Sequence, residues 1–130
     1  MKYVFATIYL SIYLSLVTCL TKEEVIQTVQ QCAQEFNLSI QQVTSLRATA
    51  MANIDPDTNS KCFASCVAKK TNVVQNGKIN EEVAKSVDAA AASVDLGPCQ
   101  GVTGSDECDT NFQITKCAMQ QFSKLNLNLI

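Results

Sequence analysis

The chain is short and mildly acidic, with 130 residues, 10 Lys and Arg against 12 Asp and Glu, and a formal net charge of −2. A charge of this size favours solubility and argues against a nucleic-acid-binding surface. The sequence has no histidine, which removes the usual catalytic triads and dyads and the zinc sites that need an imidazole. We therefore expect neither an enzyme nor a metal or cofactor site.

The N-terminal segment is typical of a secretory signal peptide. Lys2 precedes an uncharged apolar run over residues 3–17, and cleavage fits best after Cys19, with a site one or two residues later as the alternative. The alternative is a membrane anchor, but the run is shorter than the ~20 apolar residues of a spanning helix, and no second apolar segment follows. We predict removal of residues 1–19 and a secreted, extracellular domain over residues 20–130, without membrane insertion.

Two helices are predicted first, each opened by a capping box. Thr21 begins one such box and predicts a helix over about residues 22–36, with its apolar residues on one face. Ser39 repeats the pattern with Gln42 and predicts a second helix that stops near Asn53. The first half of the domain is therefore expected to be helical.

Three further helices follow, separated by turn signals. One is predicted over about residues 59–71, before the tight-turn dipeptide Asn76-Gly77. The next starts at Asn80, carries a narrow apolar face and stops at Gly97-Pro98. The last is predicted over about residues 105–123. No β-strand is predicted within this domain, which gives an all-α class.

Six cysteines remain after cleavage, and an even set in an exported chain implies three disulfides. Cys62 and Cys66 lie one helical turn apart and face the same way, whereas Cys108 and Cys117 lie nine residues apart and face opposite sides of their helix. Bridges must therefore join different helices, but several connectivities stay open. The six are Cys32, Cys62, Cys66, Cys99, Cys108 and Cys117.

This framework resembles that of the insect odorant-binding proteins, of the general odorant-binding and pheromone-binding type. The spacing of three residues between the second and third cysteines and eight between the fifth and sixth carries the resemblance. That family's third helix and the turn after it are similar to Lys61-Cys-Phe-Ala-Ser-Cys-Val-Ala-Lys-Lys and Val73-Val-Gln-Asn-Gly-Lys-Ile-Asn. The resemblance implies five to six helices around an apolar cavity, braced by Cys32–Cys66, Cys62–Cys108 and Cys99–Cys117.

The resemblance also implies a function. The protein would carry a small hydrophobic ligand, such as an odorant or pheromone, through extracellular fluid, with a membrane odorant receptor as an indirect partner. We expect a monomer or weak homodimer. The alternative is a secreted salivary, venom or reproductive factor on the same fold that scavenges ligands or acts by surface contact with another protein.

Candidate ligand-binding residues are apolar positions at helical spacing, although each is first a core residue. Few aromatic residues are present, which favours an aliphatic cavity for a long-chain or terpenoid-like ligand. Thr115 is the hydrogen-bonding candidate, against its commoner bond to the carbonyl four residues earlier. The candidates are Val25, Val29, Leu46, Met51, Val73, Val74, Val83, Val87, Val94, Ile114, Thr115, Ala118, Met119, Phe122 and Leu127.

Three further expectations concern the tail, pH and modification. Residues 125–130 alternate apolar and polar side chains, which suits either a lid on the cavity or a frayed terminus. Without histidine, we predict weak pH dependence of ligand binding between about pH 6 and 8. Asn37-Leu38-Ser39 is an N-glycosylation sequon at a helix junction.

Overall fold

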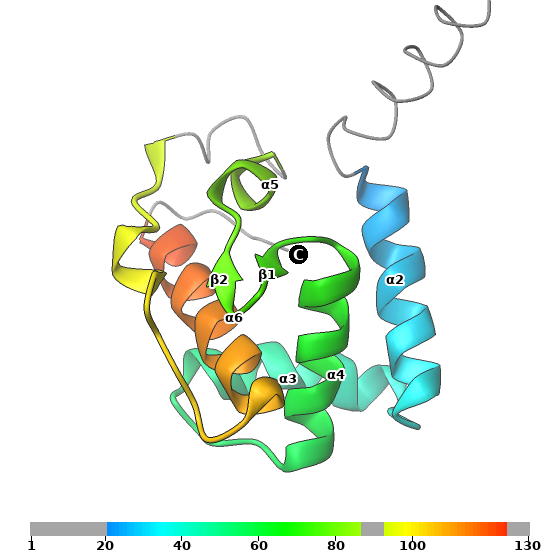
Figure 1. Ribbon diagram of the computed structural model, residues 1–130. Helices are drawn as coiled ribbons and strands as arrows, with labels where there is room; N and C mark the ends of the chain where they lie inside the picture. The colour runs from blue at the N-terminus through cyan, green and yellow to red at the C-terminus, as the bar shows by residue number, and fades with distance from the viewer. Residues whose placement is uncertain (1–20, 87–92, 125–130) are drawn as a thin grey trace, which may run out of the picture.

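The computed structural model describes residues 21–86 and 93–124, and this part is mainly helical (Figure 1). Five α-helices, one two-stranded hairpin and one short 3-10 helix follow one another along it. The predicted all-α class is confirmed. The elements are α2 Lys22–Glu35, α3 Ile40–Met51, α4 Thr58–Lys70, β1 Val74–Gln75, β2 Lys78–Ile79, α5 Glu81–Lys85, η2 Gly97–Cys99 and α6 Glu107–Ser123.

Both predicted capping boxes are present. The Glu24 backbone N–H donates to Thr21 Oγ1 at 3.2 Å, and the Thr21 N–H donates back to the Glu24 carboxylate at 3.3 Å. Ser39 and Gln42 exchange the same two bonds at the start of α3. These bonds satisfy backbone groups that a helix N-terminus leaves without partners, so α2 and α3 begin where the sequence predicts.

The fourth helix is shorter than predicted. α5 ends at Lys85, and the backbone at Val94 is not helical. Val94 and Leu96 are both buried, whereas Asp95 between them is exposed and its Oδ1 accepts the Gly97 N–H at 2.9 Å. This local bond closes a turn before η2, and the alternating burial sends both apolar side chains into the core, so a helix continuing to Gly97 was the wrong prediction.

The predicted tight turn at Asn76-Gly77 closes a short antiparallel hairpin. Val74 pairs with Ile79, and both side chains are buried. Asn76 and Gly77 have positive φ angles of 53° and 73°, as a two-residue hairpin turn requires. The sequence pattern predicts the turn. It does not predict the strands, because two residues are too few to show an alternating pattern.

All three implied disulfides are confirmed. Cys32–Cys66 joins α2 to α4, Cys62–Cys108 joins α4 to α6, and Cys99–Cys117 joins η2 to α6. The helix pair α4 and α6 has the most extensive contact, and α2 stands along the other side of α4 (Figure 1). The two cysteines of α4 thus attach its neighbours on both sides.

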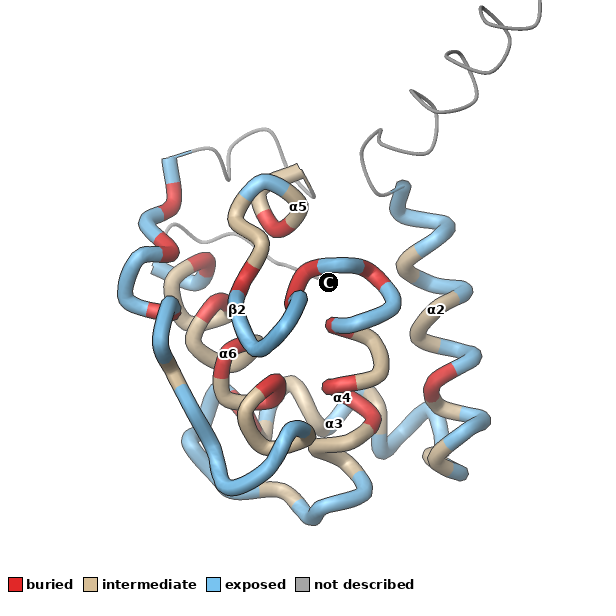
Figure 2. Tube along the Cα trace, in the orientation of Figure 1, coloured by how far each residue is buried: buried red, intermediate tan, exposed pale blue. Residues whose placement is uncertain are grey.

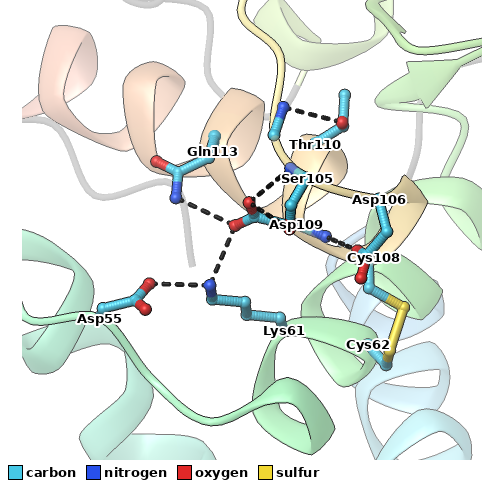
Figure 3. A network of polar contacts seen from close by, with 10 residues as sticks. Asp55, Lys61, Cys62, Ser105, Asp106, Cys108, Asp109, Thr110 and Gln113 are labelled. Atoms are coloured by element: carbon cyan, nitrogen blue, oxygen red, sulfur yellow. Dashed lines mark hydrogen bonds and ion pairs between the residues drawn. A yellow bond between two sulfur atoms is a disulfide. The ribbon is translucent and has the colours of Figure 1, made fainter.

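A polar network lies beside the bridge between α4 and α6 (Figure 3). Lys61 Nζ lies 2.8 Å from Asp55 Oδ1 and 3.0 Å from Asp109 Oδ1. The Ser105 backbone N–H donates to Asp109 Oδ2 at 2.8 Å. That backbone bond, followed by the bond from Lys61, holds the pKa of Asp109 well below its usual value, and the two carboxylates raise the pKa of Lys61. The network fixes the loop before α6 against the start of α4.

The buried residues form two clusters, and Figure 2 shows them concentrated on α4, α6 and the hairpin rather than on α2 or α3. Within residues 21–86 and 93–124, no helix is long and apolar enough to cross a membrane. The smaller core contains Ala50, Ala64 and Phe112, with Leu46 and Met119 packed against it. The larger core contains Ala68, Val73, Val74, Ile79, Ala84, Val94, Leu96, Cys99, Ile114, Ala118 and Phe122.

Candidate ligand-binding cavity

A cavity of about 330 Å³, partly open to solvent, lies among α2, α3, α4 and α6. This volume falls within the roughly 300–1,000 Å³ typical of small-molecule sites. Its lining is mostly aliphatic, with two phenylalanines and four polar side chains. The lining residues are Val25, Val29, Val43, Thr44, Leu46, Arg47, Ala50, Phe63, Ala64, Val67, Ala68, Thr71, Val73, Phe112, Thr115 and Met119.

Each helix presents one face to the cavity, because its lining residues recur at helical spacing. Val25 and Val29 lie one turn apart on α2, and the Cys32–Cys66 bridge near the end of that helix holds it against α4. Val43 and Ala50 mark the corresponding face of α3. The disulfide brace therefore keeps α2 in place as one side of the cavity.

The two cores differ in what they enclose. Every residue of the smaller core lines the cavity. Ala68 and Val73 are the members of the larger core that reach it, and the rest of the larger core is packed around the hairpin and η2. The cavity therefore adjoins the smaller core, while most of the larger core is packed without reaching it.

Six of the predicted binding residues lie together in the cavity lining. These come from α2, α3, α6 and the start of the hairpin, so segments far apart in the sequence converge there. Ligand contact at these positions stays a prediction. The six are Val25, Val29, Leu46, Val73, Thr115 and Met119.

Seven other predicted residues lie away from the cavity. Val74, Val94, Ile114, Ala118 and Phe122 belong to the larger core, and Val83 packs against it. Met51, at the end of α3, has 36% of its surface exposed. The remaining two candidates, Val87 and Leu127, lie outside the described residues, as does the tail over residues 125–130.

The geometry of α6 explains much of this division. Successive residues of α6 are rotated by about 100° around the helix axis, so residues at different spacings lie on different faces. Two adjacent faces of α6 are buried. Phe112, Thr115 and Met119 occupy the face toward the cavity. The neighbouring face is filled by Ile114, Ala118 and Phe122, which pack in the larger core. Apolar periodicity identifies buried positions but does not separate two such faces.

Ten lining residues were absent from the predicted set. Several stood on predicted apolar stripes, and those stripes were the available signal. Ala64, Ala68 and the polar residues gave no signal of their own, although Arg47 follows Val43 by four residues and precedes Ala50 by three. The ten are Val43, Thr44, Arg47, Ala50, Phe63, Ala64, Val67, Ala68, Thr71 and Phe112.

The three lining threonines direct their hydroxyl protons into their own helices. Thr44 Oγ1 donates to the Ile40 carbonyl at 2.8 Å, and Thr71 Oγ1 donates to the Val67 carbonyl at 2.7 Å. Thr115 Oγ1 donates to the carbonyl four residues earlier at 2.8 Å, the alternative considered for it above. A hydroxyl has one proton, so toward the cavity these oxygens can only accept hydrogen bonds.

A small helical domain with three disulfides and an apolar cavity defines a small-ligand-binding protein. The chain belongs to the PBP/GOBP family, the insect odorant-binding proteins, whose family model matches residues 17–121. The resemblance seen in the cysteine pattern is thereby confirmed, and the chain stands among carriers of hydrophobic ligands.

One solved structure supports the same fold. It is a fatty acid binding protein, OBP56a, from the oral disk of the blowfly Phormia regina. The two chains are 26% identical, the match covers 82% of this chain and 98% of the blowfly chain, and the TM-score is 0.60. No similar sequence was found among curated proteins.

Proposed function

We propose that this protein is exported after removal of residues 1–19 and carries a small, elongated apolar ligand through extracellular fluid. The observation that carries this proposal is the partly open cavity of about 330 Å³ among four helices. Burial of apolar ligand surface there contributes about 25 cal/mol per Å² to binding. The three disulfides offset the packing that the core loses to the cavity.

An aliphatic chain suits the lining better than a stacked aromatic ring. Apart from Phe63 and Phe112, its apolar residues are valine, leucine, alanine and methionine, and the chain contains no tryptophan. Met119 adapts its shape to different ligands because its side chain is unbranched and polarisable. The blowfly relative is described as fatty acid binding, which supports a long-chain ligand for this protein as well.

Competitive displacement of a fluorescent apolar probe, N-phenyl-1-naphthylamine, tests the carrier proposal. Fatty acids, terpenoids, alkanols and aromatic compounds would be titrated against the probe at constant protein concentration. We expect long-chain aliphatic compounds to displace it best. Failure of the probe and of all four classes to bind would contradict the carrier proposal and favour a secreted factor that acts by surface contact.

Two partner expectations belong to the same proposal. A carrier of this kind delivers its ligand to a membrane odorant receptor without itself entering the membrane. We also propose a monomer or weak homodimer, which sedimentation equilibrium across a range of protein concentrations would test. A stable dimer at the lowest concentration would contradict that oligomeric state.

A further inference from the structure

Arg47 is the one charged side chain among the described residues that line the cavity. It is half-buried on the face of α3 that also carries Val43 and Ala50. Thr44, one turn earlier on the same helix, lines the cavity and is exposed, so this edge of the cavity reaches solvent. The Arg47 side chain therefore lies where the apolar cavity meets water.

Arg47 also differs from the polar neighbours in what it offers a ligand. The three lining threonines have each given their only hydroxyl proton to a backbone carbonyl. Among the described lining residues, Arg47 is therefore the side chain whose polar group carries N–H donors. A ligand whose polar end only accepts hydrogen bonds finds its complement at this residue.

We propose that Arg47 binds the carboxylate of an elongated ligand whose hydrocarbon chain fills the cavity; this assignment rests on the carrier function proposed above. A guanidinium matches a carboxylate with two parallel charge-assisted hydrogen bonds. Arg47 already takes part in an interaction within the protein, so the ligand carboxylate shares the guanidinium with that partner or displaces it.

Thr71 and Thr115 disfavour a carboxylate at their own positions. Their oxygens present lone pairs to the cavity, and a carboxylate placed beside Thr71 or Thr115 would meet acceptors instead of donors. Thr71 is buried, so a charge there would also lose its hydration. The anionic end therefore lies at Arg47, the one charged side chain among the described lining residues, and the hydrocarbon chain occupies the apolar rest of the lining.

Three ligands of equal chain length test the assignment: dodecanoate, dodecan-1-ol and methyl dodecanoate. The quantity to measure is the ratio of the dodecanoate affinity to the methyl dodecanoate affinity, by displacement of the same fluorescent probe at pH 7.5. Replacing Arg47→Gln should lower this ratio about tenfold, equivalent to about 1.4 kcal/mol. Lys78→Gln removes the same charge from an exposed position outside the cavity lining and should keep the wild-type ratio.

An unchanged ratio in Arg47→Gln would overturn the assignment, and so would an equal fall in Lys78→Gln. Should Arg47→Gln not fold, the wild-type protein decides alone. It must bind dodecanoate more tightly than the methyl ester, and the difference must shrink as salt is added; an ester that binds as well as the acid refutes the role of Arg47. If none of the three ligands binds, the carrier proposal itself fails.

Discussion

Lys61 and Asp109 form an ion pair between the start of α4 and the start of α6, with 3.0 Å between Nζ and Oδ1. Each side chain is only 14% exposed. Each residue also stands next to a cysteine of the Cys62–Cys108 bridge. A covalent and an ionic link between the same two helices therefore act within one turn of each other.

Replacing Asp109→Asn should lower the free energy of unfolding by about 1–2 kcal/mol, because the Asp109 carboxylate accepts the Ser105 backbone N–H and is the better shielded partner of Lys61. The measurement is thermal or urea unfolding followed by circular dichroism, with the disulfides intact. Asp55→Asn is the matched control. Asp55 pairs with the same lysine but is 74% exposed, so its loss should leave the midpoint close to wild type. Equal effects of the two variants would contradict this ranking.

Stability should be flat between about pH 6 and 8 and should fall as the solution becomes acidic. The folded-state pKa values of Asp57 and Asp109 lie below 3.8, so both contribute fully above pH 3.8 and lose their contribution as the pH falls through the lower folded values. Lys61 has a raised pKa and loses its contribution only at strongly alkaline pH.

Ligand binding should share this flat range, and probe affinity measured at half-unit steps from pH 6 to 8 checks it. A neutral ligand such as dodecan-1-ol isolates the protein's own titration. The chain has no histidine to titrate there. A loss of affinity in this window would show that another group with a shifted pKa controls binding.

Two alanine substitutions should distinguish the role of the cavity from that of the larger core. Ala64→Leu places extra volume in the cavity and should weaken binding of a long alkanol with little loss of stability. Ala118 is fully buried in the larger core, so Ala118→Leu should cost about 1–3 kcal/mol of stability through overpacking. If the Ala64→Leu variant binds the alkanol as tightly as the wild type, the cavity is not the ligand site.

The Cys32–Cys66 bridge should matter more for binding than its stability contribution suggests. Removing it by Cys32→Ala and Cys66→Ala should cost roughly 2–4 kcal/mol. It should also weaken probe binding, because α2 carries Val25 and Val29 into the cavity lining.

The matched control for that variant is Cys99→Ala with Cys117→Ala, which releases η2 from α6 outside the cavity lining. Both double variants would be compared at a temperature where both are folded. Equal losses of affinity would mean that the disulfides act only on global stability and that α2 has no separate role.

Ligand affinity should increase with chain length until the cavity is full. In a series of straight-chain alkanols, each added methylene contributes up to about 0.8 kcal/mol, or about fourfold in affinity. Probe displacement across the series should give a rise followed by a plateau. A flat response from the shortest member onward would show that apolar burial does not drive binding.

The parts of the fold that the sequence predicts are those set by local chemistry. Thr21 and Ser39 open helices because their side chains bond nearby backbone groups, and Asn76 with Gly77 adopts the positive φ angles of a hairpin turn. The disulfide pairing came from the family resemblance, since spacing left alternatives. The end of α5 was missed because burial in the larger core, and not helix propensity, determines the conformation at Val94 and Leu96.

The cavity is harder to predict because it depends on which buried face meets empty space. Ile114 and Met119 are both apolar residues of α6, yet one packs in the larger core and the other lines the cavity. Arg47 was missed for a related reason. Its charge excludes it from an apolar pattern, and only the packing of α3 against its neighbours shows that it lines the cavity.

The three disulfides hold α2, α4, η2 and α6, whereas α3 carries no cysteine. Of the four helices around the cavity, α3 is therefore the one that can separate from the others by breaking non-covalent contacts alone. Uptake and escape of ligand should proceed by transient outward movement of α3, and their rates should follow its local opening rather than global unfolding. Backbone amides of α3 should then exchange with solvent faster than those of α4, and bound ligand should slow that exchange.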